Sequence, residues 1–163
     1  MARPGSDAAV SLSVLDRLID YEPQNSQEAP PTRSQSVRLL KEGVRRDLEW
    51  LLNTRLVAVA PDEKLREVGK SVYAYGLPDF TIYSLSSPND RTKLVRHLQT
   101  AIKQFEPRLA RVRVVPLEAA EAASRTLRFR IEAMLLMDPA PELISFDTVL
   151  QLSTGQCEVS NAG

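Results

Sequence analysis

The sequence contains few of the residues from which enzymes and metalloproteins usually build their sites. Its 163 residues include one cysteine, Cys157, and one histidine, His97. A lone cysteine excludes a disulfide within the chain, and with one histidine it leaves too few ligands for a transition-metal site. The six glycines form no Gly-x-Gly-x-x-Gly or Gly-x-x-x-x-Gly-Lys pattern of the kind that holds a phosphate. We therefore expect neither a metal nor a cofactor.

Excess charge and long apolar runs are also missing. The 21 basic residues equal the 21 acidic ones, so the chain has no general attraction for a phosphate backbone, and nucleic acid is not its expected partner. No stretch approaches the roughly 20 apolar residues of a membrane-spanning helix, and the start of the sequence shows no signal-peptide pattern. We expect a cytoplasmic protein that does not insert into a membrane.

The composition, 43% hydrophobic and 26% charged, is typical of one soluble domain with a flexible tail. Residues 1–35 are predicted to be that flexible segment, with a short helix at 11–20 and a proline-rich linker after it. The helix is indicated by the spacing of Leu12, Leu15, Leu18 and Ile19. Two interpretations stay open, because this helix either folds back on its own domain or docks on another protein.

Residues 36–160 are predicted to form the main domain, which begins with two long helices. The first opens near Ser36, and its apolar face is Val37, Leu40, Val44, Leu48, Leu51 and Leu52. Its charged residues, including Arg45 and Arg46, are interpreted as a solvated face. The second helix is expected to be capped by Asn89 or Asp90 and to end at Phe105.

After residue 109 the apolar spacing changes from helical to alternating, which indicates strands. Strands are predicted to start at Val112, to cover 127–135, to run from Phe146 to Leu152, and to finish with a short segment over Cys157–Val159. The segment 138–142 is too rich in proline to be strand. The predicted fold class is α+β, with two main helices packed on a small, mostly antiparallel sheet and a short N-terminal helix tethered to it.

Carboxylates are plentiful, and two of them flanking a cleft would make a glycoside hydrolase. The candidates by residue type are Asp79, Glu106, Glu132, Asp138, Glu142 and Asp147. Arg108 would stabilise the ionised form of Glu106, which is the opposite of what a general acid needs. We therefore predict no catalytic residue, and a muramidase-like hydrolase of peptidoglycan is kept as the alternative function.

The most informative stretch is the junction Glu106-Pro107-Arg108, between the second helix and the first strand. Pro107 disfavours helical geometry in the residue before it, so the helix must end there and the chain leaves in a fixed direction. Arg108 then reaches back to Glu106 or to free carbonyls at the helix end and locks the junction, or one of the two charged residues faces a partner protein. Both hold if the corner is a partly buried network at an interface. The short last strand also suggests a sheet edge to which another chain can add a strand.

This junction, together with Tyr75–Phe80, Ser145–Leu150, Ser153–Gly155 and the early Leu15–Leu18 helix, resembles one family. The chain is similar, from about Leu12 to Val159, to the TssE-type baseplate wedge protein of bacterial type VI secretion systems. These proteins are related to the small wedge proteins of contractile phage tails.

The resemblance implies a structural role. Such proteins form wedges with other baseplate proteins, and their fold is similar to the strand-exchanging part of the sheath subunit, so they nucleate the contractile sheath by strand addition. By that analogy Glu106, Pro107 and Arg108 occupy the Glu-Pro-Arg motif associated with core integrity and wedge contacts. The lysozyme label that this family has carried is not transferred here, because no residue pair supports that chemistry.

Overall fold

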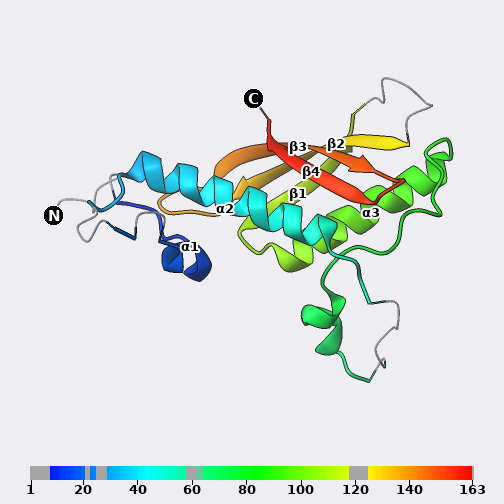
Figure 1. The fold of residues 1–163 in the computed structure, drawn as a ribbon, viewed down its shortest axis with the longest axis horizontal. Helices are drawn as coiled ribbons and strands as arrows, with labels where there is room; N and C mark the ends of the chain where they lie inside the picture. Colours follow the sequence, from blue (N-terminus) through cyan, green and yellow to red (C-terminus); the bar gives the residue numbers. More distant parts are fainter. Residues whose placement is uncertain are drawn as a thin grey trace.

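Helices come first and strands last in the described part of the chain (Figure 1). The computed structural model describes residues 8–20, 23–24, 29–57, 62, 64–117 and 125–162. The helical elements are α1 (Val14–Leu18), α2 (Arg33–Asn53), the 3-10 turns η1 (Val68–Lys70) and η2 (Val72–Ala74), and α3 (Pro88–Phe105). The strands are β1 (Leu109–Pro116), β2 (Thr126–Leu135), β3 (Glu142–Gln151) and β4 (Gln156–Asn161).

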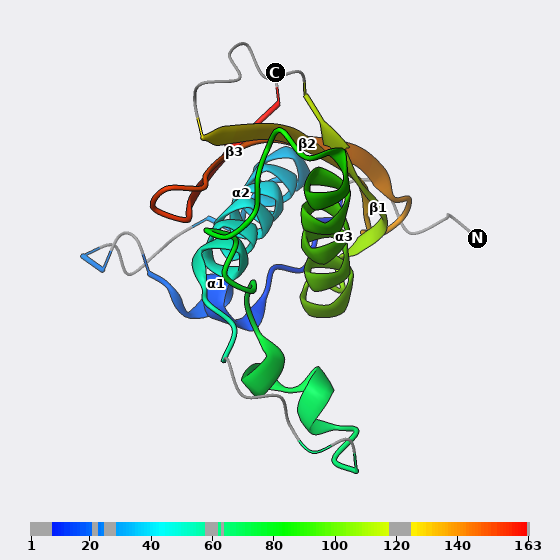
Figure 2. The ribbon, with the colours of Figure 1, turned by 90° about the vertical axis from the view of Figure 1, so that its right-hand side faces the viewer.

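The four described strands form one sheet in the order β1-β2-β3-β4, and every neighbouring pair is antiparallel. This arrangement confirms the predicted α+β class. Strands β1 and β4 are the two edges, and both long helices lie beneath the same face of the sheet (Figure 2). Helix α2 contacts β4, and α3 contacts β1.

The core lies between this sheet face and the two helices. Alternate residues of each strand point into it, and Phe129 and Ile131 of β2 are fully buried against Leu48 of α2 and Leu98 of α3 within one apolar cluster. The opposite face of the sheet carries polar and charged side chains, as the alternation of the strands predicts.

Several element boundaries differ from the sequence prediction because local capping groups set them. Helix α2 begins at Arg33, before Ser36, since Thr32 and Gln35 form a capping box. Ser87, followed by Pro88, caps α3 by accepting from the backbone N–H of Asp90, so the expected caps Asn89 and Asp90 lie inside its first turn.

All four strands are longer than predicted: β1 begins at Leu109 and not at Val112, and β2 begins one residue early, at Thr126. β3 begins at Glu142, within the segment that its prolines were expected to keep out of the sheet, because both prolines precede that residue. β4 extends on both sides of the predicted Cys157–Val159 segment, to Gln156 and Asn161. Helix α1 is shorter than the expected 11–20, and Ser13 caps it. None of the described helices has the length and apolar character needed to cross a membrane.

Candidate functional site

The Glu106-Pro107-Arg108 junction forms a tight corner between α3 and β1. The N–H of Glu106 closes the last helical turn on the carbonyl of Ile102 at 2.9 Å, and Glu106 itself leaves helical geometry with φ −119° and ψ 78°. The N–H of Leu109 then bonds to the carbonyl of Glu106 at 3.1 Å, and β1 starts at that residue. As predicted, the Glu-Pro pair ends the helix and turns the chain directly into the sheet.

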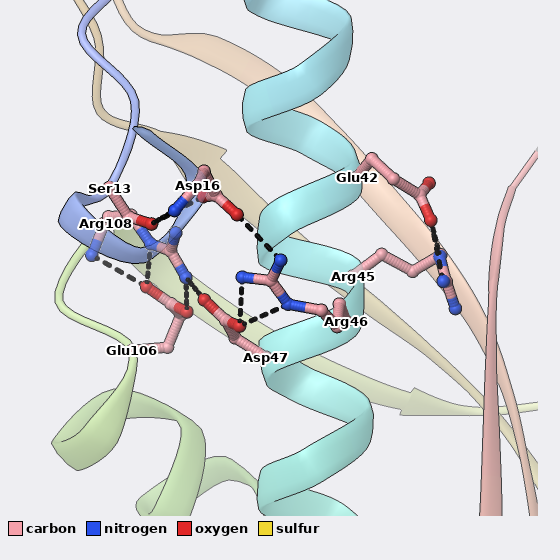
Figure 3. Close-up of polar contacts among 8 residues, drawn as sticks. All are labelled: Ser13, Asp16, Glu42, Arg45, Arg46, Asp47, Glu106 and Arg108. Carbon is pink, nitrogen blue, oxygen red and sulfur yellow. Dashed lines mark hydrogen bonds and ion pairs between the residues drawn. The ribbon is translucent and has the colours of Figure 1, made fainter. Parts of the chain in front are cut away.

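The side chain of Arg108 reaches back to Glu106 (Figure 3). Its Nε donates to Oε1 at 2.6 Å, and its Nη2 donates to Oε2, so the contact is bidentate. The backbone N–H of Arg108 also points to Oε1, at 3.3 Å. Glu106 is only 4% exposed, and a carboxylate that is so buried needs such a partner because isolated charges are costly in the interior.

A second carboxylate, from α2, completes the coordination of Arg108. Oδ2 of Asp47 lies 2.6 Å from Nη2 of Arg108. Oδ1 of Asp47 accepts from Nε and Nη2 of the neighbouring Arg46, at 3.1 and 2.9 Å. The corner is therefore joined to the middle of α2 as well as to the end of α3.

The network continues into the N-terminal segment. Nη1 of Arg46 lies 2.7 Å from Oδ1 of Asp16 in α1, and Oδ2 of Asp16 accepts from the hydroxyl of Ser13 at 2.5 Å. Helix α1 thus lies against its own domain. Gly43 makes this approach possible, because a Cβ there would lie 2.7 Å from Oδ2 of Asp16.

The residues before α1 also contact the main domain. The N–H of Val10 bonds to the hydroxyl of Ser36 at 2.9 Å, and the guanidinium of Arg33 reaches the carbonyls of Ala8 and Asp138 at 2.9 and 2.7 Å. The segment 8–19 therefore runs across the start of α2 and past the corner.

Five charged side chains of alternating sign make up what we call the corner network: Glu106, Arg108, Asp47, Arg46 and Asp16. Burial alone would lower the pKa of Arg108, but its hydrogen bonds to Glu106 and Asp47 and their charges raise it. Burial alone would raise the pKa of Asp16, but hydrogen bonds from Ser13 and Arg46 and the charges of Arg46 and Arg108 lower it. Both shifts favour permanently charged groups, which suits a structural lock better than proton transfer.

Sequence reasoning found Glu106, Pro107 and Arg108 but missed the rest of the network. Arg46 was assigned to a solvated face, whereas it bridges Asp47 and Asp16 and lies over the ring of Trp50, with its Cζ 4.9 Å from the ring centroid. Glu42 pairs with Arg45, at 2.7 Å. The one available signal was Gly43, since a glycine inside a well-formed helix often marks a close approach by another segment.

Three of the other carboxylates proposed as catalytic candidates have hydrogen-bond partners of their own. Asp147 pairs with Arg130 on the outer face of the sheet, at 2.7 Å, and this hydrogen bond and charge lower its pKa. Glu142 pairs with Lys41 at 2.7 Å. Hydrogen bonds from Thr81 lower the pKa of Asp79, whereas a general acid needs a raised one.

A small sheet backed by two helices, with its helix–sheet junction locked by ion pairs, defines a structural α+β module. The family model of baseplate wedge protein gp25 matches residues 38–140. That range contains most of α2, all of α3, the corner, β1 and β2. The chain belongs to this family of baseplate wedge proteins, as the sequence resemblance predicted.

Membership gives the chain a structural role in a baseplate wedge, where such proteins assemble with other baseplate proteins. Helix α1 and the whole of β3 and β4 lie outside the matched range. A search among curated proteins gives no match to the chain.

Proposed function

We propose that this chain is a non-enzymatic wedge subunit of a type VI secretion baseplate in the bacterial cytoplasm. In this proposal it binds other baseplate proteins through the corner Glu106-Pro107-Arg108 and helps to nucleate the contractile sheath by strand addition. The observation that carries the proposal is the corner network, which joins α1, α2, α3 and the sheet at one point and of which every member but Asp16 lies in the family-matched range.

Arg108 is suited to contact a partner as well as to hold the fold. Its Nη1 atom is buried and has no hydrogen-bond partner among the described residues. A groove of about 790 Å³ passes the same side chain and is bounded by residues 8–13, Leu136 and Pro139. A carboxylate from a partner that entered this groove would lie close to the Arg108 guanidinium, and such a charge-assisted contact is among the stronger polar contacts.

The alternative, a muramidase-like hydrolase, is less well supported. That chemistry needs two carboxylates facing each other across a cleft, one of them protonated. Glu106, Glu142 and Asp147 are each held by a basic side chain, and they lie in different parts of the domain. The oxygens of these carboxylates are therefore already engaged by basic side chains of the same domain.

The test of the corner is an Arg108→Ala variant in a strain with an active secretion system and a fluorescent sheath subunit. We expect visible sheath assembly to be lost, because both the network and the partner contact lose their central cation. Normal sheath assembly and contraction in this strain would contradict the proposal.

An Asp47→Asn variant separates binding from folding, since Asp47 touches the same guanidinium but lies outside the corner. Both variants are compared by thermal unfolding of the purified proteins. Assembly that fails only with Arg108→Ala, while both purified variants remain folded at the growth temperature, supports a contact role. Clearing of purified peptidoglycan by the wild-type protein, lost with Glu106→Gln, would favour the hydrolase instead.

A further inference from the structure

The two edges of the sheet are not equally available to a new strand. Along any strand, backbone N–H and C=O groups of alternate residues point to opposite sides. In β4 the N–H and the carbonyl of Cys157 both bond to a side chain of α2, so these backbone groups point away from β3. The N–H of Ala162 bonds to the carbonyl of Ser145 in β3. The backbone groups of Val159 and Asn161, which alternate with it, therefore point away from β3, as those of Cys157 do.

Helix α2 closes this edge. The carboxamide of Asn53 accepts from the N–H of Cys157 at 2.9 Å and donates to its carbonyl at 2.7 Å, which are the two bonds that a neighbouring strand would make. The same carboxamide donates to the carbonyl of Glu49 at 2.8 Å, so it is fixed to the end of its helix. Further along β4, Nη1 of Arg45 donates to the carbonyl of Val159 at 3.1 Å.

Among the described residues, side chains close the β1 edge at one position only. The N–H of Leu117 bonds to the carbonyl of Arg128 in β2. The backbone groups of Val114 and Pro116, which have the opposite orientation, therefore point away from β2. Gln99 of α3 donates to the carbonyl of Val112 at 3.0 Å. Among the described residues nothing bonds to the outward groups of Val114.

Positive charge flanks this open stretch. Arg111 and Arg113 of β1 are exposed, and neither forms an ion pair with a described residue. Arg111 has a φ of 53° at the bulge between Ala110 and Arg113. Backbone bulges at sheet edges turn side chains away from their regular positions, and a non-glycine residue at positive φ is strained.

We propose that β1 is the edge to which the partner strand adds, that β4 takes none, and that the incoming strand is short and acidic. This inference rests on the strand addition of the proposed function and says where it occurs. The N–H and carbonyl of Val114 and the carbonyl of Pro116 offer backbone bonds, while Pro116 has no N–H. Acidic residues opposite Arg111 and Arg113 complement their charge. Each molecule therefore accepts a new strand at one edge of its sheet, β1, and not at the other.

Backbone amide hydrogen exchange tests the choice of edge without altering the protein. In the free protein the amide of Val114 should exchange faster than that of Cys157, which Asn53 holds. Binding of the purified sheath subunit of the same secretion system should then slow Val114 and leave Val159 and Asn161 unchanged. The labelled complex is dissolved under quenching conditions, and the amides are read by NMR.

The two possible failures are distinguishable. Slower exchange at Val159 and Asn161 with no change at Val114 overturns the inference and leaves strand addition standing. A complex in which neither edge gains protection overturns strand addition itself.

A charge reversal tests the acidic character of the incoming strand. Arg113→Glu should weaken binding of the sheath subunit by about tenfold, because it places like charges on adjoining strands. Arg128→Glu is the matched control, since Arg128 is exposed on an inner strand, β2, and not on the edge. Equal binding by both variants and the wild-type protein would overturn the acidic assignment.

Discussion

Asp47 and Arg108 are 61 residues apart in the sequence, yet their side chains meet at 2.6 Å. Because of this contact, the corner holds α2 as well as α3. A local pair between Glu106 and Arg108 would fix only the end of α3, whereas the additional bond to Asp47 fixes α2 against the same point. Because Arg46 extends the contact to Asp16, the position of the N-terminal helix also depends on the corner.

Replacing Arg108 with alanine should lower the free energy of unfolding by about 3–5 kcal/mol, since it leaves a buried carboxylate without its cation. The carboxylate in question is Glu106, which is 4% exposed. Urea unfolding followed by circular dichroism measures the loss. Arg130→Ala is the control, because its pair with Asp147 is exposed to solvent and its removal should change the unfolding midpoint little. Equal effects of the two substitutions would contradict a buried lock.

Docking of α1 should weaken in acid. The folded-state pKa of Asp16 is lowered from its ordinary value of 3.8. The stability that its ionised form contributes is therefore complete above that value and is lost as the pH falls through the lower folded pKa. Trp50, the single tryptophan, reports the change, because Arg46 lies over its ring and binds Asp16. We expect a fluorescence transition below about pH 4 that precedes global unfolding.

Two variants assign that transition. Asp16→Asn should abolish it, because no carboxylate remains to titrate. Asp147→Asn should leave it in place, although the pKa of Asp147 is also lowered, since that residue lies on the outer face of the sheet. If the transition survives in Asp16→Asn, another group controls Trp50 and the docking argument fails.

Gly43→Ala should release α1 while leaving α2 intact. In an ordinary helix interior this substitution stabilises by about 1 kcal/mol. Here the new methyl group would lie 2.7 Å from Oδ2 of Asp16 and displace it. Trypsin should then cut after the exposed Arg17 faster than in the wild-type protein, as measured by mass spectrometry. Gly69→Ala is the control, because nothing lies within 4 Å of a Cβ there, and equal cleavage of all three proteins would show that α1 does not need the glycine.

Local signals predicted much of this fold. The helical spacing of Leu94, Leu98 and Ile102 and the alternation around Phe129 identify α3 and β2, because burial on one face imposes these periods. The Glu-Pro pair predicted the junction, since its effect is confined to neighbouring backbone. The start of α2 was missed because nearby prolines suggested a linker, although Thr32 caps the helix.

The candidate site was predictable only in part, for a different reason. Glu106 and Arg108 are close in sequence, but Asp47 and Asp16 reach them through tertiary packing. Charged residues on a helix have the same pattern whether they face solvent or another segment. The bond between Asn53 and Cys157 is likewise non-local, so the closed edge of the sheet is visible only in three dimensions.

Cys157 provides a chemical probe of that closed edge. Burial, with a smaller effect from the charge of Glu49, raises the pKa of its thiol to about 12, so little thiolate is present at pH 8 and native protein should react slowly with a disulfide reagent. Asn53→Ala removes two hydrogen bonds from the backbone of Cys157, each worth about 1 kcal/mol. Labelling should therefore accelerate by about tenfold or more, because β4 separates from α2 more often.

The control for labelling is Asn161→Ala, on the same strand and exposed. It removes a carboxamide of the same chemistry that makes no described bond to Cys157, so its labelling rate should match that of the wild-type protein. A rate that rises in both variants would indicate general loosening of the C-terminal strand. A rate that rises in neither would mean that the Asn53 carboxamide does not hold this edge. Acceleration in Asn53→Ala alone assigns the closure of β4 to one side chain of α2.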